Sequence, residues 1–233
     1  MGRFAGLADR LANRLASSGL NPLHLCGRTL LSVVPGGMGM GMGMGMGKGV
    51  GVSAHRLAGS VAGDAAVGTL SSVDLRRHHP DLMDRTRGLE LGDTARAREL
   101  INAASLKGLT REIVAARVRS GGRGLLAINL MRAASAYAAC VRCALEAGID
   151  AVVVGAGLPL NLPDLAQDHP QTALIPIPIP IPIPSDARGV QLLVKKRERK
   201  KRLPDAIVIE HPRVAGGPGR GRNRRPERPA LRF

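Results

Sequence analysis

The chain has 233 residues, with 34 lysines and arginines against 18 acidic residues, and its formal net charge is +16. Apolar residues make up 44% of it, which is too many for a disordered polymer and enough for a sizeable core. Only Phe4, Tyr137 and Phe233 are aromatic, so the chain offers nucleic-acid bases almost nothing on which to stack.

Short aliphatic runs alternate along the chain with segments of helical period, a pattern typical of βαβ units and a parallel sheet. Six runs predict strands: Thr29–Val34, Ala66–Leu70, Leu125–Leu130, Ala151–Val154, Ala173–Ile177 and Ala206–Ile209. Helices are predicted over Ser53–Ala62, Ala95–Ala104, Arg111–Ser120, Ser135–Ala147 and Ala187–Lys201. Ser53 and Ser135 are expected to cap their helices, and Gly148 is expected to end one. The fold class is therefore α/β, an incomplete TIM-type (β/α)8 barrel of about six parallel strands.

Three segments make up the expected domain organisation. Residues 1–26 form an N-terminal amphipathic helix, residues 27–217 a partial barrel, and residues 218–233 a disordered basic tail. Two low-complexity insertions interrupt the barrel, a Met-Gly repeat at 38–47 and a Pro-Ile repeat at 176–184. Alternating proline removes every second backbone donor, so the fifth strand is expected to give way there to an extended polyproline-like stretch.

The compartment follows from the cysteines and from the hydropathy. Cys26, Cys140 and Cys143 cannot pair without leaving one over, which favours a reducing cytoplasm. No apolar run reaches the ~18 to 20 residues that cross a bilayer, so we expect no membrane partner. A mitochondrial transit peptide at the N-terminus is the alternative.

Two motifs that resemble known sites lack the surroundings that those sites need. Gly47-Lys48 has no glycine at P-loop spacing before it. Cys140 and Cys143 form a C-x-x-C pair inside an alanine-rich helix, so we interpret them as packing residues rather than as redox or metal-binding groups.

Two charged segments are interpreted as solvent-exposed. His78 and His79 stand beside arginines and before a proline, and we expect a solvated loop rather than a metal site. The basic run 195–202 is interpreted as a solvated helix end. Its alternative, binding of nucleic acid or another anionic surface, stays open, although we consider a nucleic-acid partner the less favoured interpretation.

Five segments resemble the nitronate monooxygenase family, formerly called 2-nitropropane dioxygenases, to which flavin-dependent enoyl-acyl carrier protein reductases are related. They are Pro35–Met38, Val50–Ala58, Ala127–Met131, Gly155–Leu160 and Ile207–Gly217. The resemblance implies an FMN-binding TIM barrel that oxidises alkyl nitronates with O2, with NAD(P)H reducing the flavin in related members. The flavin contacts that it implies are Gly37, Met38, Asn129, Gly155, His211 and Gly216.

The chain also departs from the family. Pro218 follows Ala215-Gly216-Gly217 where the family has a catalytic histidine, so we assign no catalytic residue. No aliphatic run matches the two later strands whose loops bind the FMN phosphate in this barrel type. We therefore expect FMN binding to be weak or lost, activity to be impaired, and the open sheet edges to favour self-association.

One hypothesis accounts for these departures together. Two-residue repeats correspond to six-base repeats that are prone to copying slippage, and a tail rich in Arg, Gly and Pro is expected from GC-rich DNA read in a shifted frame. The rival interpretations are a basic nucleic-acid or anionic-surface binding protein and a non-functional fragment.

Overall fold

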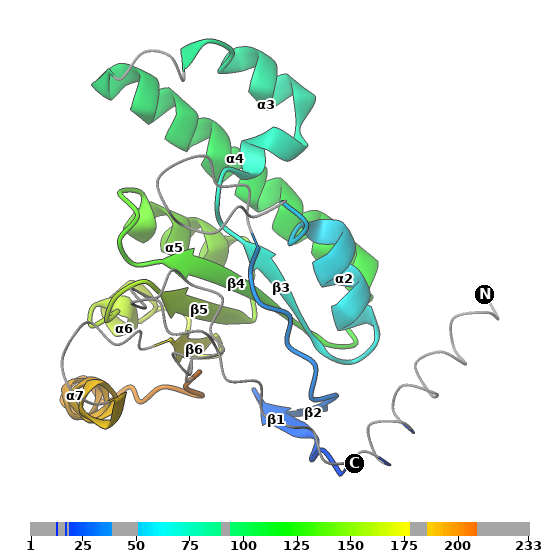
Figure 1. Ribbon diagram of the computed structural model, residues 1–233, viewed down its shortest axis with the longest axis vertical. Coiled ribbons are helices and arrows are strands. Elements are labelled where there is room, and N and C mark those ends of the chain that lie inside the picture. Colours follow the sequence, from blue (N-terminus) through cyan, green and yellow to red (C-terminus); the bar gives the residue numbers. More distant parts are fainter. Residues whose placement is uncertain are drawn as a thin grey trace, which may run out of the picture.

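A parallel sheet of four strands forms the centre of the molecule (Figure 1). The computed structural model describes residues 13, 17, 19–38, 51–89, 94–177 and 186–208. The strands are β3 Val67–Ser71, β4 Leu125–Met131, β5 Ala151–Gly155 and β6 Ala173–Pro176. They lie side by side in chain order, β3-β4-β5-β6, as consecutive strands of a (β/α)8 barrel do. All four were predicted to within one residue at each end, because strands buried on both faces are continuous aliphatic runs.

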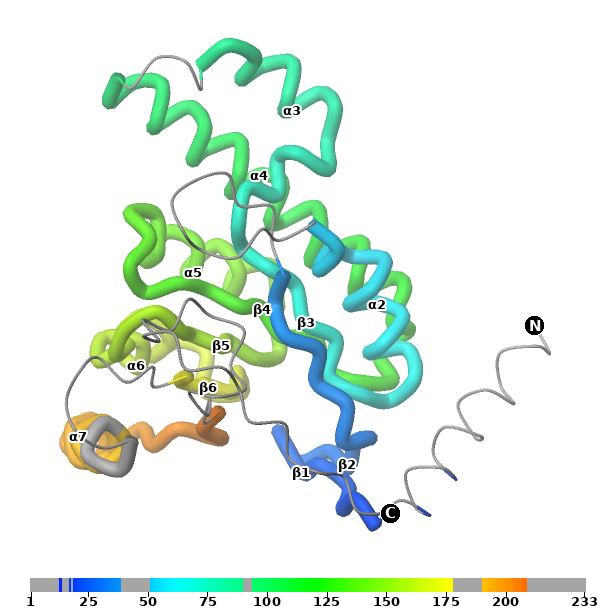
Figure 2. Tube along the Cα trace, viewed as in Figure 1, coloured from blue at the N-terminus to red at the C-terminus, as the bar shows by residue number. Residues whose placement is uncertain are grey.

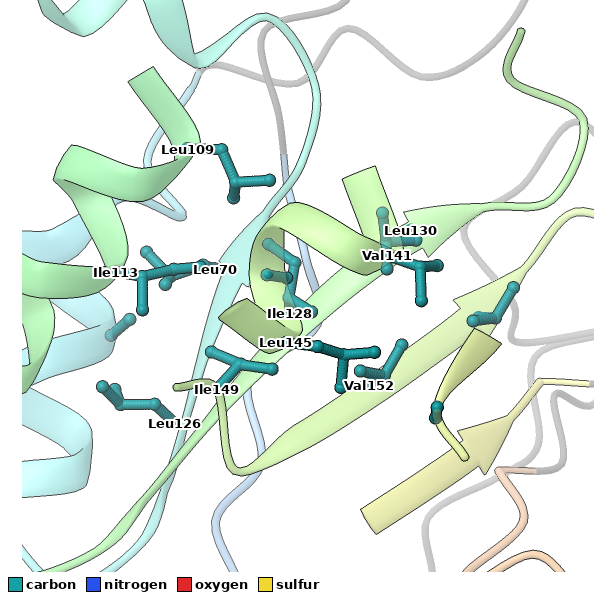
Figure 3. Close-up of a cluster of buried hydrophobic side chains, with 14 of the residues drawn as sticks. Leu70, Leu109, Ile113, Leu126, Ile128, Leu130, Val141, Leu145, Ile149 and Val152 are labelled. Atoms are coloured by element: carbon teal, nitrogen blue, oxygen red, sulfur yellow. The ribbon is translucent and has the colours of Figure 1, made fainter. Parts of the chain in front are cut away.

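One face of the sheet, here called the outer face, is covered by helices. Leu70, Ile128 and Val152 of adjacent strands pack there against Ile113 and Val141, as Figure 3 shows. The helices that supply this layer are α2 His55–Gly63, α4 Ala95–Ser120, α5 Tyr137–Glu146 and the single turn α6 Leu162–Leu165. The helix α7 Asp186–Glu198 follows β6. Figure 2 traces this order from the cyan α2 through the green α4 to the yellow β6.

The long helix α4 corrects the prediction of two separate helices over 95–104 and 111–120. It runs unbroken through Gly108, which is buried against the short helix η1 Leu75–His78. A Cβ at Gly108 would lie 2.8 Å from the backbone nitrogen of Arg76, so glycine is required for this close approach. Between η1 and α4 lies the unpredicted helix α3 Pro80–Arg85.

The helix caps differ in part from those expected. The residues at the N-caps of α2 and α5 are Ala54 and Ala136, so Ser53 and Ser135 are not caps. Thr94 caps α4 instead, where its hydroxyl accepts a hydrogen bond of 3.1 Å from the Ala97 nitrogen. Gly148 does end α5 as predicted. Its φ is +77°, and the nitrogen of Ile149 bonds to the Ala144 oxygen at 3.1 Å, the long hydrogen bond of a Schellman motif.

An antiparallel hairpin precedes the parallel sheet and was not predicted. Its strands are β1 Leu23–Leu25 and β2 Arg28–Leu30, and both loop residues, Cys26 and Gly27, have positive φ, as a type I′ turn requires. The segment Leu23–Leu25 was assigned to the N-terminal helix, and part of the predicted strand Thr29–Val34 belongs to this hairpin.

The hairpin covers the amino-terminal end of the inner face, which is the sheet face opposite the helices. Leu25 and Leu30 cluster there with Val67, Leu125 and Ala173. Those three residues lie at the first position of β3, β4 and β6. This end of the inner face is therefore filled by apolar side chains.

The two outermost predicted strands run beside the sheet without being regular strands. Leu31 donates to the Ala65 oxygen at 2.9 Å, and Val67 donates to the Val33 oxygen at 3.2 Å. At the other edge Asp205 and Val208 donate to oxygens of β6 at 3.2 and 3.1 Å. The described chain thus has the α/β order of a partial TIM-type barrel, with four regular parallel strands instead of about six.

Several predictions fall wholly or mostly outside the described residues. They concern most of the N-terminal helix expected over residues 1–26, the two low-complexity repeats and the tail at 218–233. Among the helices that are described, none is long and apolar enough to cross a membrane.

Candidate functional site

The carboxyl ends of the parallel strands place one row of side chains at the open edge of the inner face. Ser71 pairs with Asn129, Asn129 with Val153, and Val153 with Ile175. The row is polar at β3 and β4 and apolar at β5 and β6. In α/β sheets ligands bind at this carboxyl edge, so this row is the candidate site.

Ser53 ties the segment that precedes the Met-Gly repeat to this edge. Its hydroxyl accepts a hydrogen bond of 2.8 Å from the Met38 nitrogen and donates one of 3.3 Å to the Gly36 oxygen. Its carbonyl accepts from the Ser71 nitrogen at 2.9 Å. The turn Gly36–Met38 is therefore held against the end of β3 by a serine that sequence reasoning took for a helix cap.

Gly37 lies directly against Asn129. A Cβ added at Gly37 would be 2.5 Å from the Cβ of Asn129, closer than any real side chain allows. Met38, the next residue, is 48% exposed. Three of the predicted flavin contacts, Gly37, Met38 and Asn129, thus come from segments far apart in the sequence and meet at one edge.

Gly155 ends β5 and pairs with Met131, two residues beyond the row that contains Asn129 and Val153. Its carbonyl accepts a hydrogen bond of 2.8 Å from the Arg132 nitrogen. The chain then turns through Ala156 and Gly157, with φ of +54° and +128°. Gly155 is therefore at the same edge as predicted, whereas His211 and Gly216 lie outside the described residues.

A buried carboxylate that sequence reasoning missed stands behind this edge. Glu112 of α4 is 1% exposed, and its Oε2 lies 2.8 Å from His55 Nδ1 and 2.7 Å from the His55 nitrogen. Its Oε1 lies 3.2 Å from His79 Nε2. The prediction of a solvated His79 is therefore wrong, because that side chain is 18% exposed and faces Glu112. No spacing rule connects residues so far apart in the chain.

The C-x-x-C pair is a packing feature, as predicted. Cys140 and Cys143 lie on α5 against the outer-face core, and Cys143 Sγ is 3.2 Å from the Thr110 hydroxyl. Burial, with the neighbouring Cys143 second, raises the pKa of Cys140 to about 11, which disfavours the reactive thiolate. No group of three potential metal ligands occurs in the described part of the chain.

Arg197 of α7 is fully buried, although its helix was expected to end in solvent. In the described part of the chain none of its three guanidinium nitrogens has a hydrogen-bond partner. Burial lowers its pKa, and the nearby Tyr137 and Asp205 act in the opposite direction. Burial also raises the pKa of Tyr137 to about 12, and the ring of Tyr137 lies 5.0 Å from the guanidinium carbon of Arg132.

The fold and this edge define an α/β protein whose sheet corresponds to consecutive strands of a (β/α)8 barrel. Among solved structures, FabK from Thermotoga maritima is similar over 70% of this chain and 39% of its own, with 17% identity and a TM-score of 0.43. Its M276A mutant is similar over 67% and 38%, with 16% identity and a TM-score of 0.42. The chain thus spans about two fifths of the length of those proteins. No family model matches the sequence, and a comparison with curated proteins finds no match.

Proposed function

We propose that this chain is a flavin-binding oxidoreductase of the nitronate monooxygenase type that holds FMN weakly and has impaired activity. The observation that carries the proposal is the contact between Gly37 and Asn129 at the carboxyl edge of the sheet. It joins two segments that each resemble flavin-contacting segments of that family. Their meeting is independent of the resemblance, because it follows from the packing of the turn Gly36–Met38 on β4.

The residues at the edge fit the ring of a flavin. The Asn129 side chain is half-buried, and its amide makes no hydrogen bond within the described residues. An amide both donates and accepts, which suits the alternating donors and acceptors along one flavin edge. The exposed thioether of Met38 supplies a soft apolar contact beside it. One row deeper, the Thr69 hydroxyl is buried without a partner in the described part of the chain.

The row itself offers no charge to a phosphate group, and the cation nearest to it in the chain, Arg132, lies over the ring of Tyr137. The four side chains of the row, Ser71, Asn129, Val153 and Ile175, carry no charge. A ring bound there is held by apolar contact and by neutral hydrogen bonds, which are weaker than charge-assisted ones. We therefore expect FMN and riboflavin to bind with similar, weak affinity.

The proposed chemistry is the oxidation of an alkyl nitronate with O2, with NAD(P)H as a possible reductant in place of the nitronate. When bound, FMN supplies the electron transfer, and the chain's own residues orient the ring and cover one face of it. Since Pro218 stands where the resemblance implies a basic histidine, proton removal from a substrate has no assigned group. An alkyl nitronate is already the deprotonated form of a nitroalkane, so the slow turnover that we expect for it comes from weak FMN binding rather than from the missing base.

Titration of the full chain with FMN and with riboflavin, followed by flavin fluorescence, tests the proposal. We expect both to bind and Asn129→Leu to weaken both equally. Asn102→Leu, on α4, serves as the control and should leave binding unchanged. Absence of flavin binding, or equal loss in both variants, would contradict the proposed site. An oxygen electrode with propyl-2-nitronate then measures turnover, and rapid O2 consumption would show that the expected impairment is wrong.

A further inference from the structure

The end of α7 carries a group of cations that the rest of the fold does not neutralise. Lys195, Lys196, Arg199 and Lys201, here called the basic face, are all exposed. Within the described part of the chain none of them forms an ion pair. Lys200, in their midst, pairs with Asp164, and the acidic Glu198 is exposed beside them.

Elsewhere on the described surface, many arginines have an acidic partner. The ion pairs are Arg77–Asp74, Arg87–Asp84, Arg96–Glu99, Arg111–Asp81 and Arg117–Asp150. The unpaired cations outside α7 are dispersed over other elements, whereas those of the basic face lie within seven residues. The basic face is therefore a local concentration of positive charge.

Three of these four side chains lie on one side of the helix and its last turn, whereas Lys201 follows with a φ of +51°, so the helical spacing does not place it. At about 100° per residue, Lys195, Lys196 and Arg199 fall within roughly a third of the helix circumference. Leu193 and Arg197, both 0% exposed, point the opposite way, toward the fold. Beyond Glu198 the chain continues in one more turn, since the nitrogen of Lys201 bonds to the Glu198 oxygen at 2.9 Å.

The basic face lacks what a lipid surface requires. A helix that binds a bilayer inserts a broad apolar face, whereas Leu193 of α7 is buried in the protein and only Leu192, 44% exposed, is a large apolar side chain on the same side as the basic face. Among the described residues the only aromatic side chain is that of Tyr137, which is 3% exposed in the core, so none of them lies exposed beside the basic face. Binding of single strands by base stacking is thus disfavoured. What the basic face offers a partner is mainly charge.

We propose that the basic face of α7 binds the phosphate backbone of double-stranded nucleic acid without regard to sequence. Four lysine and arginine side chains would replace about four condensed counterions, so the logarithm of the binding constant falls with that of the salt concentration with a slope of about −3.6. This corresponds to roughly a hundredfold weaker binding when salt rises from ~50 to ~200 mM.

The test uses the full chain and a fluorescent 30-base-pair DNA duplex of arbitrary sequence, followed by anisotropy over a range of salt concentrations. The test variant replaces the basic face by glutamine: Lys195→Gln, Lys196→Gln, Arg199→Gln and Lys201→Gln. The control variant removes the same charge from exposed cations that have no ion pair on other elements: Arg56→Gln, Lys107→Gln, Arg123→Gln and Arg142→Gln. Thermal melts by circular dichroism confirm that both variants fold as the parent does.

We expect the test variant to bind at least tenfold more weakly at ~100 mM salt, with the salt slope shallower by about 3.6 units. The control variant should stay within about twofold of the parent, because its charges are dispersed over other elements and do not form one basic surface. Equal weakening in both variants would overturn the proposal in favour of net charge. Unchanged binding in the test variant would place the interface elsewhere in the chain. Binding to vesicles that contain phosphatidylserine, without binding to the duplex, would identify a lipid surface instead.

Discussion

Gly37 and Asn129 touch so closely that the position before Met38 must be glycine. Asn129 ends the polar part of the inner row, and the turn Gly36–Met38 reaches it only because no Cβ intervenes. The turn is held from its other side by the Ser53 hydroxyl. The turn Gly36–Met38, Ser53 and Asn129 thus form one packed unit at the edge of the sheet. A change in one of them is expected to displace the others.

Replacing Gly37 by alanine is expected to separate the turn from β4. The added methyl group would overlap the Asn129 Cβ, so we predict a loss of about 1–3 kcal/mol in the free energy of unfolding and weaker flavin binding. The matched control is Gly36→Ala, because a Cβ at Gly36 meets no atom within 4 Å. Urea denaturation and flavin titration measure both effects. Equal behaviour of the two variants would contradict the close contact.

Removing the carboxylate of Glu112 is expected to weaken the packing of α4 against the start of α2 and against the residue that precedes α3. Its two oxygens face His55 at the start of α2 and His79 before α3. Glu112→Gln keeps one acceptor but loses the charge, and we predict a destabilisation of about 1–3 kcal/mol in chemical denaturation. Glu99→Gln, in an exposed pair with Arg96, should cost at most about 0.5 kcal/mol. A similar cost in both variants would mean that Glu112 contributes no more than a surface charge.

Arg197 is the residue whose replacement is expected to stabilise the protein. A buried guanidinium without hydrogen-bond partners in the described part of the chain carries an uncompensated desolvation penalty. Arg197→Met keeps much of the volume and removes the charge, so we predict a gain of about 1–4 kcal/mol in the free energy of unfolding. Arg199→Met, on the exposed side, should change it by less than about 0.5 kcal/mol. A drop in melting temperature for Arg197→Met would show that the guanidinium has a favourable partner.

The thiols of Cys26 and Cys140 are expected to react in a fixed order. Cys26, in the hairpin turn, is exposed. Cys140 is partly buried, and because burial raises its pKa to about 11, only ~0.1% of it is thiolate at pH 8. We predict that a disulfide reagent labels Cys26 first and Cys140 only as fast as the protein unfolds, with mass spectrometry identifying the sites. Rapid labelling of Cys140 in the folded protein would revive the redox interpretation of the C-x-x-C pair.

The parallel strands could be predicted from sequence because their burial on both faces leaves a local signal. The hairpin could not, since its strands have three residues each and its type I′ turn uses cysteine where asparagine or aspartate is usual. The continuity of α4 was hidden by Gly108, whose helical position depends on packing against η1. A local pattern does not contain that contact.

The candidate site was predicted in part for the same reason. Asn129 and Gly155 stand at strand ends, which the aliphatic runs locate, and Gly37 comes three residues after the end of the first run. The roles of Ser53 and Glu112 depend on tertiary contacts instead. Ser53 looked like a cap because it precedes a helix, yet its hydroxyl bonds to Met38 and Gly36. In the sequence, Glu112 resembles any acidic residue of an amphipathic helix. Only the structure brings His55 and His79 to its carboxylate.

The paired hydrogen bonds between Met38 and Ser53 have a consequence for how this gene can vary. Met38 donates to the Ser53 hydroxyl, and the Ser53 nitrogen donates to the Met38 oxygen at 3.3 Å, so these two residues are held side by side although 14 residues separate them in the sequence. The Met-Gly repeat lies between these two residues. Copies of the dipeptide added or lost there would leave the positions of β3 and α2 unchanged. A change in the length of the Met-Gly repeat is therefore expected to have little effect on folding, so selection for a folded protein would not remove it.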